Sequence, residues 1–102
     1  MNSVVQKNID SEENTFIFLL HERSIFDEAL FQEYIENVGL VNVENTEKKL
    51  IIRVIEINDY IIRNALYHFL PEDLFVMENF PPNMGNYIEQ IRIENERLLR
   101  ML

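Results

Sequence analysis

Cysteine is absent from the 102-residue sequence, which excludes disulfide bonds and thiolate metal sites. Two glycines and three prolines make long irregular loops unexpected. The longest fully apolar run, residues 16–20, is far shorter than the about 20 residues that cross a bilayer. Residues 1–14 contain no apolar stretch typical of a signal peptide. These absences allow a reducing compartment, and the simplest location that they predict is the cytoplasm.

Positive charge is also scarce, because nine Lys and Arg residues stand against eighteen Asp and Glu residues. The net charge of −9 disfavours nucleic acids and anionic membranes as partners, since both attract positive charge. The excess is uneven. Residues 1–47 hold ten acidic and two basic residues, a net charge of −8, whereas residues 48–102 hold eight and seven, a net charge of −1. Such an imbalance indicates either a solubilising face or a field that steers a basic partner onto one side.

Apolar residues are plentiful, at 47%, which is too many for a disordered chain, and the length fits one domain with one core. We expect a single all-α domain over residues 1–102, with residues 1–10 flexible. The predicted architecture is a compact bundle of four main helices plus one short helix after Pro71. The first main helix would start at an N-cap Ser11 and end near His21. Because residues 16–20 are apolar on all sides, a short buried strand remains an alternative there.

The stretch SIFDEALFQEYIEN, residues 24–37, predicts a strongly amphipathic second helix. Ser24 and Asp27 resemble a capping box, and Gly39 is a helix-ending glycine. At 100° per residue, one face collects the apolar side chains of Phe26, Leu30, Phe31, Tyr34, Ile35 and Val38. The opposite face collects Glu28, Gln32, Glu33 and Glu36. No Lys or Arg occurs in this stretch to pair with the carboxylates.

Two further helices follow from the same spacing. The longer one would begin at Asn45 or Thr46, and its period holds for about 20 residues, longer than a strand. Its apolar half comprises Leu50, Ile51, Val54, Ile55, Ile57, Ile61, Ile62, Ala65, Leu66 and Phe69. The last helix would begin at Asn83 or Asn86. Its apolar stripe comprises Tyr87, Ile88, Ile91, Leu98, Leu99 and Leu102, with Asn95 interrupting it and Ile93 outside it.

The sequence shows no pattern that carries catalysis. Neither His21 nor His68 belongs to an H-E-x-x-H motif, no G-x-S-x-G frames a serine, and there is no Gly-rich phosphate loop or calcium-binding loop. We therefore expect a protein that is not an enzyme, with no catalytic residues, metal or cofactor. Tyr60 and Tyr67 fall on the polar side of the long helix, where a tyrosine is either a surface residue or an interface anchor.

Residues 65–91, ALYHFLPEDLFVMENFPPNMGNYIEQI, combine an aromatic helix end, a Pro-x-Asp-Leu start, an Asn-Phe-Pro turn and a Tyr-led final helix. This segment resembles small all-helical immunity proteins of bacterial polymorphic-toxin systems, including those of contact-dependent growth inhibition. The resemblance rests on His68, Phe69, Pro71, Asp73, Leu74, Asn79, Phe80, Pro81 and Tyr87. It implies a protein that binds and neutralises a cognate toxin domain in the cytoplasm, and many such toxins are nucleases with basic grooves.

The predicted partner-binding residues are the acidic positions with one amide between them: Glu12, Glu13, Glu28, Gln32, Glu33 and Glu36. The alternative is that the toxin is held by the polar side of the long helix, through Tyr60 and Tyr67. Two other classes remain open. An acidic nucleic-acid mimic with an anti-defence role would share the charge, although the near-neutral second half disfavours it. A homo-oligomeric helical adaptor would use Ile93 and the tail LLRML as a patch for a weak homodimer.

Overall fold

The helical spacing of apolar residues is realised along most of the chain. The computed structural model describes residues 1–69 and 77–102, and within these ranges it contains five α-helices and no strand longer than an isolated bridge. The helices are α1 (Ser3–Ile9), α2 (Phe16–Arg23), α3 (Glu28–Val38), α4 (Lys48–His68) and α5 (Met84–Leu99). The prediction of an all-α chain is confirmed for the described ranges.

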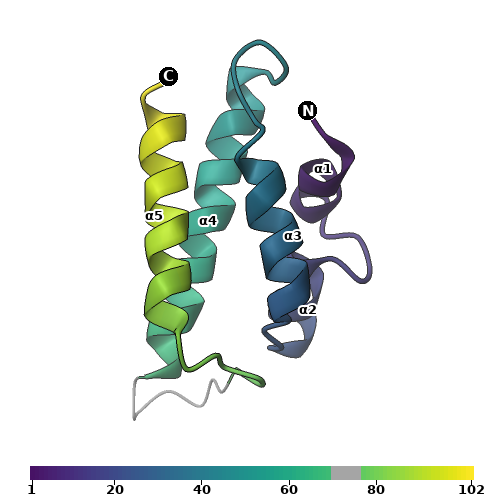
Figure 1. Ribbon diagram of the computed structural model, residues 1–102. Helices are drawn as coiled ribbons and strands as arrows, with labels where there is room; N and C mark the ends of the chain where they lie inside the picture. The colour runs from purple at the N-terminus through teal and green to yellow at the C-terminus, as the bar shows by residue number, and fades with distance from the viewer. Residues whose placement is uncertain (70–76) are drawn as a thin grey trace.

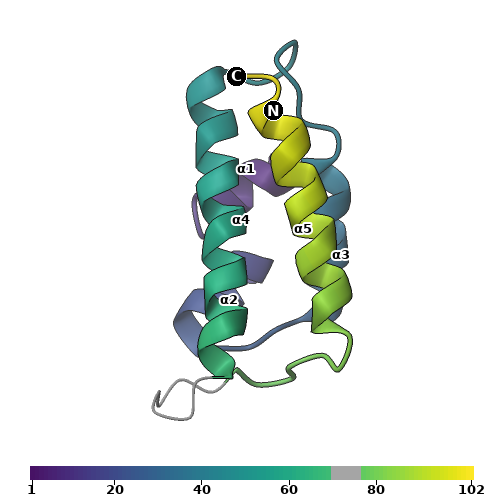
Figure 2. The ribbon, with the colours of Figure 1, turned by 90° about the vertical axis from the view of Figure 1, so that its left-hand side faces the viewer.

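Helices α3, α4 and α5 run alternately in opposite directions and form the body of the molecule (Figure 1). Helix α5 contacts both α4 and α3, α1 lies beside α3 and α4, and α2 lies beside α1 and α3. Figure 2 shows α1 and α2 together behind the pair formed by α4 and α5. The molecule measures 42 × 27 × 20 Å, and a single hydrophobic core contains buried side chains from all five helices.

The predicted apolar faces are largely buried. Every predicted core position of α3 except the half-buried Leu30 is nearly inaccessible to solvent, and so is Phe26 just before it. On α4 the prediction fails at the C-terminal end, because Leu66 and Phe69 are 55% and 64% exposed. It likewise fails at Leu99 of α5. These positions lie near helix ends, where fewer neighbouring elements are available to cover an apolar stripe.

Residues 1–10, expected to be flexible, instead contain α1. Asn2 caps this helix by accepting a hydrogen bond from the Val5 amide, and its Nδ2 donates to the Asn37 carbonyl of α3 at 3.0 Å. Val5 is fully buried, and the buried Asn8 accepts a hydrogen bond from the Ile17 amide. One apolar side chain and two asparagines therefore hold a segment that has little apolar periodicity of its own.

Residues 16–20 are helical, and they open α2. Its N-cap is Thr15, whose Oγ1 accepts a hydrogen bond from the Phe18 amide, so the predicted N-cap Ser11 is wrong. The predicted role of Ser24 in capping the helix that follows is also wrong, because Ser24 ends α2 in the left-handed region with φ of 54°. The cap of α3 is Asp27 alone, whose carboxylate accepts from the Leu30 amide at 2.9 Å.

The other helix boundaries agree with the predictions only in part. Helix α4 starts after Glu47, one or two residues later than predicted, because Asn45 is used in the preceding loop, where it hydrogen-bonds with Asn42. Gly39 follows α3 as predicted but has a right-handed φ of −60°. Helix α5 starts after Asn83, one of the two predicted positions.

The predicted short helix after Pro71 begins among residues 70–76, which lie outside the described residues. Next to them, His68 stacks on Phe80 with ring centroids 4.0 Å apart, and its Nδ1 accepts a hydrogen bond from the Met77 amide. The Glu78 amide and carbonyl bond to Ser24 and Phe26 between α2 and α3. These contacts tie the start of the last segment to the N-terminal half, and they give His68 the structural role that its position indicates.

Candidate partner-binding face

Helix α3 carries the candidate face on the side opposite its buried apolar residues. With Phe31, Tyr34, Ile35 and Val38 buried, the remaining positions point to solvent, and Glu28, Glu33 and Glu36 are all exposed. Gln32 is half-buried between Glu28 and Glu36. Positions 28, 32 and 36 are four residues apart, so this row extends about 12 Å along the helix. We call Glu28, Gln32, Glu33 and Glu36 the acidic face.

The arginines of the later helices are engaged within their own helices. On α4, Arg53 pairs with Glu56 and Arg63 with Asp59. On α5, Arg92 pairs with Glu89 and Glu96, and its hydrogen bond lowers the pKa of Glu89. Each pair joins residues three or four positions apart on one helix.

The carboxylates of the acidic face are therefore not paired with these arginines within the described ranges. Over residues 1–69 and 77–102, no Lys or Arg nitrogen lies within 4.0 Å of a carboxylate oxygen of Glu28, Glu33 or Glu36. The near-neutral second half of the sequence therefore corresponds to local pairing on α4 and α5. Among the described residues, the one ion pair between the two halves joins Lys49 to Glu47, away from the acidic face.

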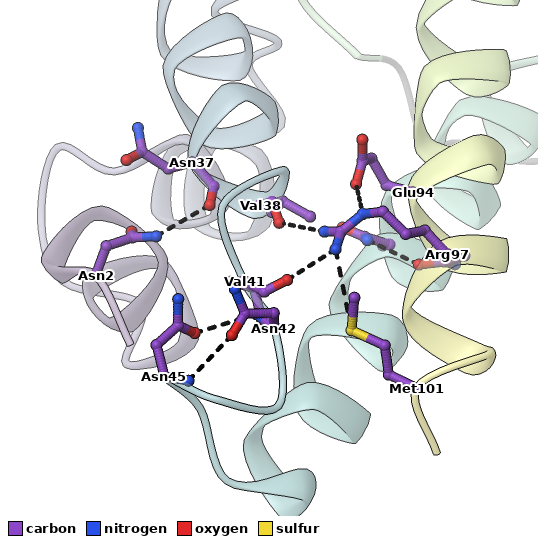
Figure 3. Close-up of polar contacts among 11 residues, drawn as sticks. Asn2, Asn37, Val38, Val41, Asn42, Asn45, Glu94, Arg97 and Met101 are labelled. Atoms are coloured by element: carbon purple, nitrogen blue, oxygen red, sulfur yellow. Dashed lines mark hydrogen bonds and ion pairs between the residues drawn. The ribbon is translucent and has the colours of Figure 1, made fainter.

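Arg97 is the one arginine of α5 that hydrogen-bonds to α3, and it contacts backbone oxygens. Its two terminal nitrogens donate to the carbonyls of Val38 and Val41, each at 2.8 Å, and its Nε donates to Glu94 (Figure 3). The C-terminal end of a helix carries unsatisfied carbonyls and a partial negative charge, so a guanidinium is favourable there. Arg97 therefore fixes the end of α3 without covering the acidic face.

Glu28 makes one side-chain contact that the sequence did not indicate. Its Oε1 accepts a hydrogen bond from the Tyr87 hydroxyl at 2.5 Å, which joins the first turn of α3 to the first turn of α5. A neutral hydroxyl leaves the negative charge in place while it fixes the side chain. Glu28 is thus both a structural contact and a charged surface group.

The remaining predicted residues fall into separate places. Glu13 and Glu33 line the same hollow between α1 and α3, together with Lys7, while Glu12 is exposed in the connection before α2. Tyr60 lies elsewhere, in a groove of about 350 Å³ between α2 and α4, with its hydroxyl 2.8 Å from His21 Nδ1. Tyr67 is 43% exposed near the end of α4. The structure therefore brings Glu13 close to the acidic face and leaves the tyrosines on another surface.

Sequence reasoning missed the side of the acidic face that borders α5. Gln32 and Glu36 line one wall of a hollow whose other wall is formed by Gln90, Ile93 and Glu94. The signal was present in part, because Ile93 was the apolar residue outside the α5 stripe. Which helix would stand opposite Ile93 depends on packing, and periodicity does not specify that.

The candidate face can bind a partner through its charge and its shape. No three His, Asp or Glu residues of the described ranges are grouped to hold a metal ion. Within the same ranges, none of the helices is both long and apolar enough to pass through a membrane. Carboxylates on one helix face that form no ion pair within 4.0 Å among the described residues suit a cationic surface.

Comparison with known proteins adds no relative. No protein-family model matches the chain, and neither a curated protein nor a solved structure matches it.

Proposed function

We propose that this chain is an immunity protein, which binds a cognate toxin domain in the cytoplasm and neutralises it without catalysis. The toxin domain would be basic, as nuclease domains that bind phosphate are. The observation that carries the proposal is the charge of the acidic face. Its three glutamates have no ion-pair partner among residues 1–69 and 77–102, whereas the arginines of α4 and α5 pair within their own helices.

The physical argument concerns both speed and selectivity. A concentrated negative field raises the rate at which a basic protein meets this side of the molecule, and it repels acidic proteins. Surface charges of this kind orient the complex, while tight binding comes from a few desolvated contacts near its centre. The resemblance of residues 65–91 to immunity proteins supports the same class from independent residues.

The test requires a gene beside that of this chain that encodes a large secreted protein, whose C-terminal domain is then the candidate toxin; the lack of such a gene would count against the proposal. We expect co-expression of the chain to restore growth to cells that produce this domain, and the two purified proteins to form a complex. Reversing Glu28, Glu33 and Glu36 to Lys together should abolish both effects. The matched control reverses three exposed acids elsewhere, Glu22, Glu44 and Glu56, which changes the net charge equally.

Two further results would count against the proposal. Equal loss of binding in both triple variants would mean that net charge matters and the acidic face does not. Binding of the chain to unrelated DNA-binding proteins as tightly as to the domain would indicate a nucleic-acid mimic.

A further inference from the structure

A hollow of about 380 Å³ lies between α3 and α5, beside the acidic face. Its α3 wall consists of Gln32, Ile35 and Glu36, and its α5 wall consists of Gln90, Ile93 and Glu94. We call it the α3–α5 groove. Its lining combines an apolar side chain from each helix with two amides and two carboxylates, a composition that suits one apolar group surrounded by polar contacts.

Ile93 is the unusual residue of the α3–α5 groove. It is 52% exposed on α5, although Ile91 two residues earlier is fully buried. A single exposed isoleucine is ordinary on a protein surface. This one lines a concave site next to an unpaired carboxylate, Glu36, so contact with an apolar group there would remove its surface from water while the charges stay available to a cation.

We infer that the α3–α5 groove receives an apolar side chain of the partner, flanked by Lys or Arg residues that pair with Glu36 and its neighbours on the acidic face. The inference rests on the proposed function and names the site, at the α5 edge of the acidic face, where binding is strongest. An apolar contact enclosed by charged pairs matches the usual anatomy of a tight interface, in which a desolvated centre is surrounded by polar contacts.

Charge identifies the kind of occupant. A second copy of this chain would bring another net charge of −9 and another set of glutamates against Glu33 and Glu36, and like charges facing each other oppose association. A partner with a basic rim meets no such opposition. The α3–α5 groove is therefore assigned to a basic protein, and self-association becomes an outcome that the test can detect.

The two walls are held at fixed positions relative to each other. Tyr87 bonds to Glu28 at one end of the helix pair, and Arg97 bonds to Val38 and Val41 at the other. A site whose walls are already in place loses less conformational entropy on binding than a mobile one. Contacts at both ends of the helix pair therefore favour a preformed α3–α5 groove.

The absence of cysteine makes a direct test available, since each single Cys variant carries one thiol. The variants are Ile93→Cys and, as matched control, Ile52→Cys on α4, where the isoleucine is 46% exposed. The rate of maleimide labelling is measured for each variant, alone and with a saturating amount of the candidate toxin domain used to test the proposed function. We expect the domain to slow labelling at position 93 by about tenfold or more and to leave position 52 unchanged.

An affinity measurement completes the test. Ile93→Ala should weaken binding by about tenfold or more, while Ile52→Ala leaves the affinity unchanged. If the domain binds and the triple reversal of Glu28, Glu33 and Glu36 abolishes binding, but both Ile93 variants behave like their controls, the groove inference is overturned and the proposed function stands. Failure of the unmodified chain to bind the domain overturns both. A concentration-dependent dimer that protects position 93 without the domain overturns the assignment to a basic partner.

Discussion

The hydroxyl of Tyr34 donates a hydrogen bond of 2.6 Å to Asn58 Oδ1, and both residues are completely buried. Asn58 Nδ2 in turn donates to Asn95 Oδ1 at 2.8 Å. This polar chain crosses the apolar core and joins α3, α4 and α5 at one level. Because a buried polar group without a partner is costly, the chain favours the one alignment of the three helices in which all its members are satisfied.

Replacing Asn58 by Leu should therefore destabilise the protein, although Leu is the more apolar residue. The change removes the partner of Tyr34 and of Asn95, and we expect the free energy of unfolding to fall by about 2–4 kcal/mol. Urea unfolding followed by circular dichroism measures it. Asn86→Leu on the exposed side of α5 is the control and should stay within about 0.5 kcal/mol of the unmodified chain. A neutral Asn58→Leu would show that the polar chain does not align the helices.

Tyr34 also predicts a dependence of stability on alkaline pH. Burial raises the pKa of its hydroxyl above the usual value of about 10, so the folded state keeps it protonated while the unfolded state ionises. Its contribution is therefore complete below about pH 10 and is lost as the pH rises further. The difference in unfolding free energy between the unmodified chain and Tyr34→Phe should be constant from about pH 6 to about pH 9 and shrink above pH 10. A difference that stays constant at higher pH would contradict this.

Arg97→Gln should lower the free energy of unfolding by about 1–2 kcal/mol, because the carbonyls of Val38 and Val41 lose their charged donor. Arg92→Gln on the same helix is the matched control. Arg92 pairs only with exposed carboxylates of α5, where water and salt screen the interaction, so no measurable change is expected. Thermal unfolding of both variants separates the two cases. Equal losses would mean that the contact of Arg97 with α3 adds nothing beyond a surface ion pair.

The start of α2 can be tested by two substitutions. Thr15→Ala should cost about 1 kcal/mol, because Oγ1 accepts from the Phe18 amide and donates to the Glu12 carbonyl. Ser11→Gly should be neutral or stabilising, since Ser11 has a positive φ of 51° that glycine adopts more readily. The free energy of unfolding in urea decides. A larger loss of unfolding free energy in Ser11→Gly than in Thr15→Ala would indicate that Ser11 is the cap, as the sequence predicts.

The proposed binding of a basic toxin domain by the acidic face predicts that their association is sensitive to salt. We expect the association rate constant to fall by about tenfold or more between about 0.05 and about 0.5 M NaCl. Replacing Glu28, Glu33 and Glu36 together by Gln should flatten this dependence, whereas Gln at Glu22, Glu44 and Glu56 should not. Stopped-flow fluorescence measures the rates. An unchanged slope in the first variant would place the steering charge elsewhere.

Periodicity sufficed for the larger helices and their buried faces. The apolar spacing of α3 and α4 extends over enough turns to identify both the helix and its core side, and it also placed the glutamates of α3 on the outside. Short helices were harder to predict from periodicity. Helix α1 has seven residues and one fully buried apolar side chain, Val5, so too few turns exist for a period to show.

The tertiary contacts of buried polar residues could not be predicted from the sequence either. Asn58 and Asn95 interrupt apolar stripes, and only the packing of three helices shows that they meet. Capping serines are similarly ambiguous, because Ser24 precedes an acidic residue by three positions yet adopts a left-handed conformation that ends the previous helix. For the candidate site, sequence located the acidic residues of α3, whereas the opposing wall on α5 depended on helix packing.

Arg97 and Tyr87 clamp α3 at its two ends, and this has a consequence for evolution. Substitutions on the outward row of α3 change neither clamp, provided that Glu28 keeps its hydroxyl contact, so the side chains at positions 32, 33 and 36 can vary while the backbone stays in place. A scaffold of this kind can acquire a new recognition specificity one side chain at a time without losing its fold.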